Sequence, residues 1–524
     1  MKKRMIGFCM VLLLGTALLL QGCGKSSAVA TEEETTQETA AKVFTYGTTA
    51  YGTDMGNVGV NPHENYSGWS AVRYGVGETL FKFDSSMQVQ PWLAESYEQI
   101  DEYTIKITLR DDVYFSNGRK MDGEAVKECL EDLIQVHDRA PEDLKISEIA
   151  ADGQTVTITT TQKATSTINY LSDPYGAIID MQAENEVEGN VAGTGPFIAQ
   201  SISDQEITLV KNENYWGGEV KIDQVIVKSI QDGDTLTMAL QSGEIDAAQG
   251  LPYASLSLFQ DNEAYTISSA ETSRSFFAQL NFKTEALQDA NVREAIAMGI
   301  DKESFTSVLL QGNGVPATGP FPESFTFGDE TVTAAAYDPQ EAQKLLAQAG
   351  WEDTDGDGYV DKDQETLTLR WLTYPSRQEL PLLAESVQDT LKKIGIKVEI
   401  NNTSNYQDFV DAGDFDVFAG AFVTAPTGDP EYFFTTHCLS ESSKNRGSYY
   451  NETLETLAVQ LRNEFDTQKR SDIAVEMTQT ILDDNAFIFA SHLKMSFVMK
   501  QKVTGFEAHP SDYYEITADL DIAS

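Results

Sequence analysis

The stretch that decides the fold runs from Trp92 to Val126, WLAESYEQIDEYTIKITLRDDVYFSNGRKMDGEAV. Its middle alternates strictly, with Tyr103, Ile105, Ile107 and Leu109 on one side and polar residues between them. A period of two predicts a strand with one face on a core and the other in water. An Asn-Gly turn follows, and a helical pattern begins at Asp122. The stretch therefore predicts a strand, a turn and a helix in an α/β domain.

Length and composition describe a large acidic globular protein. The chain has 524 residues, 82 acidic against 37 basic, and a formal net charge of −45. Single cores stop growing near about 250–300 residues, so the chain is long enough for two or three lobes. The acidic excess argues against nucleic acid or an anionic membrane surface as a direct partner. Of the four cysteines only Cys129 and Cys438 lie in the globular part, so no disulfide framework is expected. Cys129 is predicted to be a small core residue.

The N-terminus has the pattern of an export signal. A basic start at residues 2–4 precedes the apolar run 6–20, which is short for a membrane span. The sequence Leu20-Gln21-Gly22-Cys23 resembles a bacterial lipobox, with an ordinary secretory leader as the alternative. We expect a lipoprotein signal peptide at 1–22, lipidation at Cys23 and a disordered tether at 23–42, because the tether cannot bury enough apolar surface to fold. The body would then sit outside the cytoplasm, anchored to the outer face of the cell membrane.

Several blocks occur in an order that resembles a known family. They are the opening stretch, YGVGETLFKFD at 74–84, GTGPF at 193–197, VREAIAMGIDK at 292–302 and YDPQEAQKLLAQAGW at 337–351. Together they are similar to the bacterial extracellular solute-binding proteins of the oligopeptide/nickel class, family 5. They resemble the nickel-binding branch of that family slightly more than the peptide-binding branch. The resemblance implies a two-lobed periplasmic-binding-protein-like α/β fold (type II, cluster C). Residues 43–280 and 488–524 would form the first lobe with a subdomain, residues 281–487 the second lobe, and two crossings a hinge.

The same resemblance implies a function without covalent chemistry. It predicts a monomeric, lipid-anchored component of an ABC importer that holds a short peptide or a nickel–chelator complex in an inter-lobe cleft and delivers it to the permease. No cofactor is expected. The alternative is an extracellular hydrolase or binding protein for polysaccharides or sugars. Ser491-His492-Leu493-Lys494 fits SxxK, but the accompanying β-lactamase motifs are missing. Because the chain has so many acidic residues, the sequence does not decide whether two of them form a catalytic carboxylate pair.

The strongest candidate for ligand contact is the block TAPTGDPEYFF at 424–434. In peptide-binding members an Asp in this block pairs with the α-amino group of the ligand, and Asp429 occupies the matching position. The alternative is that Asp429 only forms the Gly-Asp-Pro turn. Tyr432 and Phe433 are expected in the cleft or in the core.

The resemblance suggests further ligand contacts elsewhere in the chain. Arg377 would hold a carboxylate as a rigid bidentate donor, or only begin a surface helix. Arg139 lies near the place of an arginine that meets chelator carboxylates in nickel-type members. His437 would reach a metal held by the ligand. Tyr74 is expected in the cleft or the core, and Tyr513 is expected to close the cleft.

The segment 353–358 (DTDGDG) begins like an EF-hand loop. Asp361 takes the ninth position, but Gln364 stands at the twelfth, where a bidentate Glu is needed. An Asx/Gly turn between a helix and a strand explains the segment without a metal. Calcium binding remains the minor hypothesis.

Overall fold

The computed structural model describes residues 41–52, 56–185 and 187–523. The predicted signal peptide, the lipidation site Cys23 and nearly all of the tether lie outside these residues. Within the described part of the chain, no helix has the length and apolar character that a membrane crossing requires.

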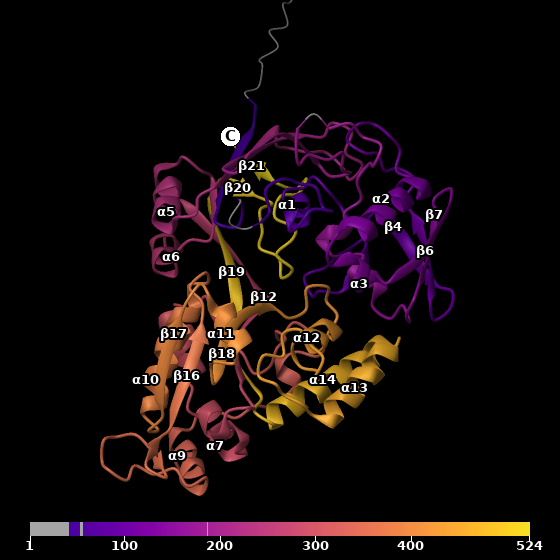
Figure 1. Ribbon diagram of the computed structural model, residues 1–524. Helices are drawn as coiled ribbons and strands as arrows, with labels where there is room; N and C mark the ends of the chain where they lie inside the picture. The colour runs from indigo at the N-terminus through magenta and orange to yellow at the C-terminus, as the bar shows by residue number, and fades with distance from the viewer. Residues whose placement is uncertain (1–40, 53–55, 186, 524) are drawn as a thin grey trace, which may run out of the picture. The chain divides into compact units, whose positions relative to one another are not determined.

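One mixed sheet of eleven strands organises the structure (Figure 1). Its order is β17-β16-β18-β12-β19-β11-β1-β10-β9-β8, and β13 pairs with β19 beside this path. The bounds are β17 Lys397–Asn402, β16 Thr368–Thr373, β18 Val417–Val423, β12 Tyr265–Leu280, β19 Phe487–Lys500, β11 Ala247–Gln249, β1 Val43–Thr48, β10 Gln224–Ser229, β9 Glu206–Lys211, β8 Phe197–Ile202 and β13 Gly314–Pro316.

The long strands β12 and β19 belong to two different parts of this sheet. Residues 265–271 of β12 pair with 494–500 of β19, whose end also pairs with β11, whereas residues 274–280 pair with β18. The register shifts between Glu271 and Ser275, which marks a bulge where one part gives way to the other. We call the part with β1 and β8–β11 the first lobe and the part with β16–β18 the second lobe. The first crossing between the lobes thus lies near residues 271–275 of β12.

A second, four-stranded sheet carries the opening stretch of the sequence. Its order is β4-β5-β7-β6, with β4 Ala94–Gln99, β5 Thr104–Leu109, β7 Thr155–Thr160 and β6 Ile146–Asp152. The predicted alternation is confirmed for Ile105, Ile107 and Leu109, each at most 1% exposed. Tyr103 was expected on the same face but is 43% exposed, because it precedes the strand.

Helix α2, Gly123–Val136, covers this small sheet. Asp122 caps it by accepting a hydrogen bond from the backbone N of Ala125 at 3.0 Å, as the sequence predicts. Its apolar residues, among them Leu130 and Cys129, lie in the same buried cluster as the β5 side chains. The core role expected for Cys129 is confirmed.

The other helices lie on the two lobes or connect their strands. Figure 1 shows α5 and α6 beside one end of β19, and α10 beside β16 and β17. The bounds are α1 Ser67–Arg73, α3 Ala140–Leu144, α4 Thr167–Tyr170, α5 Gly233–Ser242, α6 Tyr253–Gln260, α7 Ala290–Met298, α8 Lys302–Ser304, α9 Pro339–Gln348, α10 Glu379–Lys392, α11 Tyr406–Ala412, α12 Glu431–His437, α13 Glu452–Asn463 and α14 Thr467–Asp483. Short hairpins pair β2 Phe81–Phe83 with β3 Val89–Pro91, β14 Asp361–Lys362 with β15 Glu365–Thr366, and β20 Val503–Thr504 with β21 Asp521–Ile522.

Local signals read from the sequence hold in the second lobe. Asp338 accepts hydrogen bonds from the backbone N of Gln340 and Glu341 and so caps α9. Gly350 follows the helix with φ +83°, a conformation that favours glycine. Both ends of the helix therefore follow from side-chain chemistry that is visible in the sequence.

Candidate functional site

The loop 424–430 between β18 and α12 contains a buried ion pair. Asp429 and Arg470 of α14 are 6% and 4% exposed. Arg470 donates from Nη2 to both carboxylate oxygens at 2.7 Å and from Nε to Oδ2 at 3.1 Å. Burial alone would lower the pKa of Arg470, but Asp429 and Glu431 more than offset it, so the pKa lies above its usual value. The carboxylate is thus bound within the second lobe. The ion pair favours a structural role for Asp429, and its expected contact with a ligand amine stays a prediction.

The same loop holds the two lobes together. Asn169 of the first lobe donates to the carbonyl O of Thr427 at 2.8 Å, and the hydroxyl of Tyr513 donates to the carbonyl O of Pro426 at 3.0 Å. Gly428 has φ +68°, and a Cβ there would lie 2.4 Å from the carbonyl O of Met87. The loop therefore packs backbone against backbone on the first lobe. Tyr513, expected to close the cleft, meets this loop and is 2% exposed.

Four aromatic rings form a surface of the second lobe that we call the aromatic platform: Tyr374, Tyr406, Phe418 and Phe422. The ring centroids of Tyr374 and Tyr406 are 4.7 Å apart, and those of Tyr406 and Phe418 are 5.8 Å apart. Phe418 is buried, whereas the other three rings are half-buried. A half-buried cluster of rings offers an apolar surface to a solute.

Two cations lie at one end of the aromatic platform. The guanidinium carbon of Arg446 lies 4.3 Å from the Phe418 ring centroid, and Lys444 Nζ lies 5.2 Å from that of Phe422. Neither side chain forms an ion pair with a carboxylate of the described residues, and Arg446 Nη1 is buried without a hydrogen-bond partner there. Burial lowers the pKa of Lys444, and the charges of Arg446 and Arg139 lower it further.

Two more cations lie at the other end. Arg274 stands in the β12 bulge, and Arg377 follows β16; neither has an ion-pair partner in the described part of the chain. Burial lowers the pKa of Arg274 to about 10, and Arg377 is the next cause. The charge of Asp512 raises the pKa of Arg274, and that of Arg73, the ion-pair partner of Asp512, lowers it.

A cavity of about 610 Å³ opens at this second end. We call it the hinge-side cavity, because its walls come from the first lobe at 231–256, from the second lobe at 375–379 and from β19 at 493–496. Arg377 and Lys494 line it. Glu379 also lines it, but its carboxylate accepts a hydrogen bond from the Tyr253 hydroxyl. The volume is within the range of small-molecule sites.

Arg139 has carboxylate partners that offset its charge, unlike the four cations described above. Its Nη2 donates to Asp143 at 3.0 Å and to Asp173 at 3.2 Å, and its side chain is 35% exposed. Burial lowers its pKa, but these two carboxylates more than offset it and leave the pKa above its usual value. Tyr432 lies nearby and lines a smaller cavity of about 190 Å³ between residues 142–170 and 431–462. Arg139 and Tyr432 thus lie at the boundary of the lobes, and their contact with a solute stays a prediction.

The comparisons with known proteins decide the family. Residues 88–445 match the model of the bacterial extracellular solute-binding proteins, family 5 Middle. The chain belongs to family 5 of the bacterial extracellular solute-binding proteins.

Relatives of this family match most of the chain. The nickel-binding protein NikA of Staphylococcus aureus is 28% identical over 85% of this chain and 89% of its own. The probable D,D-dipeptide-binding periplasmic protein of Escherichia coli is 27% identical over 81% and 83%. The crystal structure of a nickel ABC transporter protein from Bacillus halodurans superposes with a TM-score of 0.79 at 30% identity, covering 92% of this chain and 100% of that one. The expected two-lobed α/β fold and the family are confirmed.

Three of the expected site residues of this family 5 protein are buried. Tyr74 is 1% exposed in the first-lobe core, and Phe433 and His437 are fully buried. The His437 ring stacks on Phe433 and lies 4.6 Å from the Phe422 ring centroid, and neither ring nitrogen has a hydrogen-bond partner among the described residues. Burial lowers the pKa of His437 well below its usual value, and Lys444 lowers it further. These side chains pack in the protein, which favours the core alternative for Tyr74 and Phe433. The solute contacts of all three, and the metal contact of His437, stay predictions.

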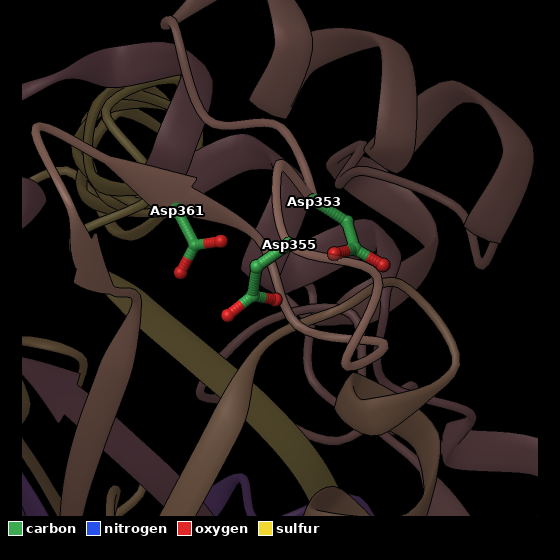
Figure 2. A group of neighbouring side chains, drawn as sticks. All are labelled: Asp353, Asp355 and Asp361. Carbon is green, nitrogen blue, oxygen red and sulfur yellow. The ribbon is translucent and has the colours of Figure 1, made fainter.

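The acidic loop of the second lobe places three carboxylates together. Figure 2 shows Asp353, Asp355 and Asp361, whose oxygens lie within 4.8 Å of one another. The Asp353 carboxylate accepts the backbone N–H groups of Gly356 and Gly358, as the turn interpretation requires. The hydrogen bonds favour the turn, and calcium binding stays a prediction.

Sequence reasoning missed four cations: Arg274, Lys444, Arg446 and Arg470. Arg470 lies in the amphipathic pattern of α14 with nothing to indicate a distant acid. Arg274 carried a weak signal, because a charged residue within two positions of the buried stretch FFAQL is unusual. Lys444 and Arg446 lie in the polar segment 440–448, where surface cations are ordinary.

Proposed function

We propose that this protein is the solute-binding component of an ABC importer and that its solute is a nickel–chelator complex held between the lobes. The observation that supports this proposal is the set of side chains at the boundary between the lobes. The half-buried aromatic platform lies on the second lobe beside cations that have no ion-pair partner among the described residues, and the hinge-side cavity has walls from both lobes. Polar and aromatic groups that converge from two bodies on one gap are typical of a capture site.

The ion pair of Asp429 supports a metal chelate over a peptide. A free peptide amine needs an unengaged carboxylate, and Arg470 already neutralises the one that the resemblance suggested. The nickel-binding protein of Staphylococcus aureus and the nickel transporter protein of Bacillus halodurans are among the proteins to which the chain is similar. A short peptide is the other outcome that a binding screen must test.

Capture would proceed by closure about β12 and β19. The bulge between Glu271 and Ser275 interrupts the ladder at the point where the sheet passes from one lobe to the other, so bending there costs few hydrogen bonds. A solute that contacts both lobes stabilises the closed form by its differential affinity for that form. The permease would then recognise the closed form, and the solute would leave unchanged.

The proposed place of action is the outer face of the cell membrane, with Cys23 carrying the lipid. Two acyl chains give stable anchoring where one is marginal. Replacing Cys23 by Ser should release the protein into the medium of the producing cells and abolish labelling with radioactive palmitate. Retention of the variant on the membrane would contradict the anchor.

A thermal-shift screen tests the solute class. The samples are the full chain with Ni²⁺ alone, Ni²⁺ with L-histidine, Ni²⁺ with a polycarboxylate chelator, and di- to pentapeptides. A ligand that binds only the folded state raises the free energy of unfolding by about 2.7 kcal/mol at a hundredfold excess over Kd. We expect a shift with a nickel chelate and none with peptides. A shift with peptides alone would assign the protein to peptide uptake, and conversion of the added compound would indicate an enzyme.

A further inference from the structure

Tyr253 belongs to the first lobe by its backbone, but its side chain touches apolar clusters of both lobes. It is the first residue of α6, whose Leu256 and Phe259 lie in a buried cluster with Val498 of β19. The half-buried ring of Tyr253 packs against this cluster and also against the second-lobe cluster to which α7, α9 and α10 contribute. One side chain therefore connects the two lobes beside the hinge strands.

The hydroxyl of Tyr253 makes a polar contact across the same boundary. It donates to the carboxylate of Glu379, which is the first residue of α10 and is 5% exposed. Among the described residues this carboxylate has no other hydrogen-bond partner. Because a buried carboxylate without a donor is costly, and a hydrogen bond to a charged acceptor is stronger than a neutral one, the contact favours the arrangement of the lobes in which the two groups meet.

Each partner is held firmly by its own lobe. A Cβ on Gly250 would lie 2.1 Å from Oγ1 of Thr49, so the backbone that leads to Tyr253 lies tight against the end of β1. In the second lobe Leu380, the neighbour of Glu379, is fully buried. Neither partner can follow the other unless its lobe moves, so the distance between the two groups depends on the angle of the hinge.

This contact lies on the face of the second-lobe sheet that is opposite to the loop 424–430. Ile488 and Phe489 are neighbours on β19 and therefore point to opposite faces. Ile488 lies in the cluster of α10, and Phe489 lies in the cluster of α12 and Ala425. The lobes thus touch on both faces of the sheet, and a rotation of one lobe about β12 and β19 changes both contacts together.

We propose that Tyr253 and Glu379 form a hinge latch, a contact that fixes the angle between the lobes and sets how readily they open. The latch holds the lobes in the arrangement in which the loop 424–430 meets the first lobe. Its consequence for solute capture rests on the proposed function, because apparent affinity falls with the fraction of molecules in the binding arrangement. Tyr253 and Glu379 are positioning residues, which act on the solute through the lobes.

Electron paramagnetic resonance distance measurements on the full chain, with no solute added, test the latch. Spin labels carried by p-acetylphenylalanine replace two exposed residues, Met238 of α5 and Glu385 of α10, one on each lobe. We expect a single narrow distance distribution in the parent chain. Tyr253→Phe keeps the ring and loses only the hydroxyl, and it should give a broader distribution or a second distance.

A matched control removes a tyrosine hydroxyl whose contact lies within one lobe. The hydroxyl of Tyr51 donates to the carbonyl O of Ser203 at 2.7 Å, and both residues belong to the first lobe. Tyr51→Phe should therefore keep the distance distribution of the parent chain. If Tyr253→Phe gives the same distribution as this control, the inference is overturned.

Combining two variants tests whether the two side chains act as one contact. Tyr253→Phe and Glu379→Ala together should broaden the distribution no more than the stronger of the two alone, because both remove the same hydrogen bond. Additive broadening would show that the two residues act separately, and the latch would be refuted.

Calorimetry with nickel–EDTA and with nickel and L-histidine separates the latch from the proposed function. We expect Tyr253→Phe to weaken whichever complex the parent chain binds by about fivefold or more, while Tyr51→Phe binds as the parent chain does. A changed distance distribution with unchanged affinity would support the latch and contradict solute capture between the lobes. If the parent chain binds neither complex, the proposed nickel solute is wrong, and the distance comparison by itself decides the latch.

Discussion

The ion pair of Asp429 and Arg470 allows a prediction that separates a structural role from ligand binding. Both side chains are almost fully buried, at 6% and 4% exposure, and three N–O contacts of 2.7–3.1 Å join them. Removing one partner of such a pair leaves a buried charge without its counter-charge, which costs about 3–5 kcal/mol. We therefore expect both single variants to be destabilised, but by different amounts.

The groups around each side chain decide which variant loses more free energy of unfolding. In Asp429→Ala, Arg470 keeps the carbonyl O of Leu461 at 2.6 Å and the Glu431 carboxylate at 3.5 Å, so the cost should lie near the lower end, about 3 kcal/mol. In Arg470→Met, the carboxylates of Asp429 and Glu431 lose their shared cation, and the cost should approach about 5 kcal/mol. The double variant removes the buried cation together with Asp429 and should regain about 2–3 kcal/mol relative to the sum.

Urea denaturation followed by tryptophan fluorescence measures these free energies, and calorimetry at 20 °C measures solute affinity. Asp429→Ala should bind the solute within about twofold of the parent, since its carboxylate faces Arg470 rather than the boundary. A loss of affinity of about tenfold or more with unchanged stability would refute this reasoning and return Asp429 to the ligand site.

Three further predictions follow from other parts of the molecule. Burial raises the pKa of Glu515 to about 8, so the folded state favours the protonated carboxyl group. Its contribution to the free energy of unfolding is complete below about pH 4.5 and is lost by about pH 8. The melting temperature should therefore fall less steeply with rising pH in Glu515→Gln than in the parent chain. Identical slopes would contradict the role of Glu515. Gly428→Ala places a Cβ 2.4 Å from the Met87 carbonyl O, so X-ray scattering should show a larger radius of gyration and solute binding should weaken; an unchanged radius would contradict the lobe contact. The stripped protein should give no heat on calcium titration, and a saturable heat that Asp355→Asn removes would establish a metal site instead.

Much of the fold was predictable because its signals are local. The strand at 104–109, the helix capped by Asp122 and the helix that Asp338 begins depend on neighbours within a few residues. The ordered family blocks supplied the rest of the architecture. The sequence does not show where the chain passes between the lobes, and only strand pairing shows that 274–280 lie beside β18.

The site was less predictable because its contacts are distant in sequence. Asp429 lies 41 residues from Arg470, and the pattern around either one gives no sign of the other. Burial of His437 and Phe433 depends on rings contributed by β12, β18 and β19, which a single-segment pattern cannot show. Arg377 was recognised as a candidate, but the cations that accompany it were not.

The sequence by itself determined the class of this protein: an α/β solute-binding chain whose strands, caps and family blocks are encoded by short-range patterns. The tertiary structure alone decided which charges are paired within the protein. Pairing between charges depends on which side chains folding brings within a few ångströms, and burial sets the free energy of leaving one unpaired. That is why Asp429, the residue most prominent in the sequence, is bound inside one lobe, while Arg274, Lys444 and Arg446 have no ion-pair partner at the boundary among the described residues.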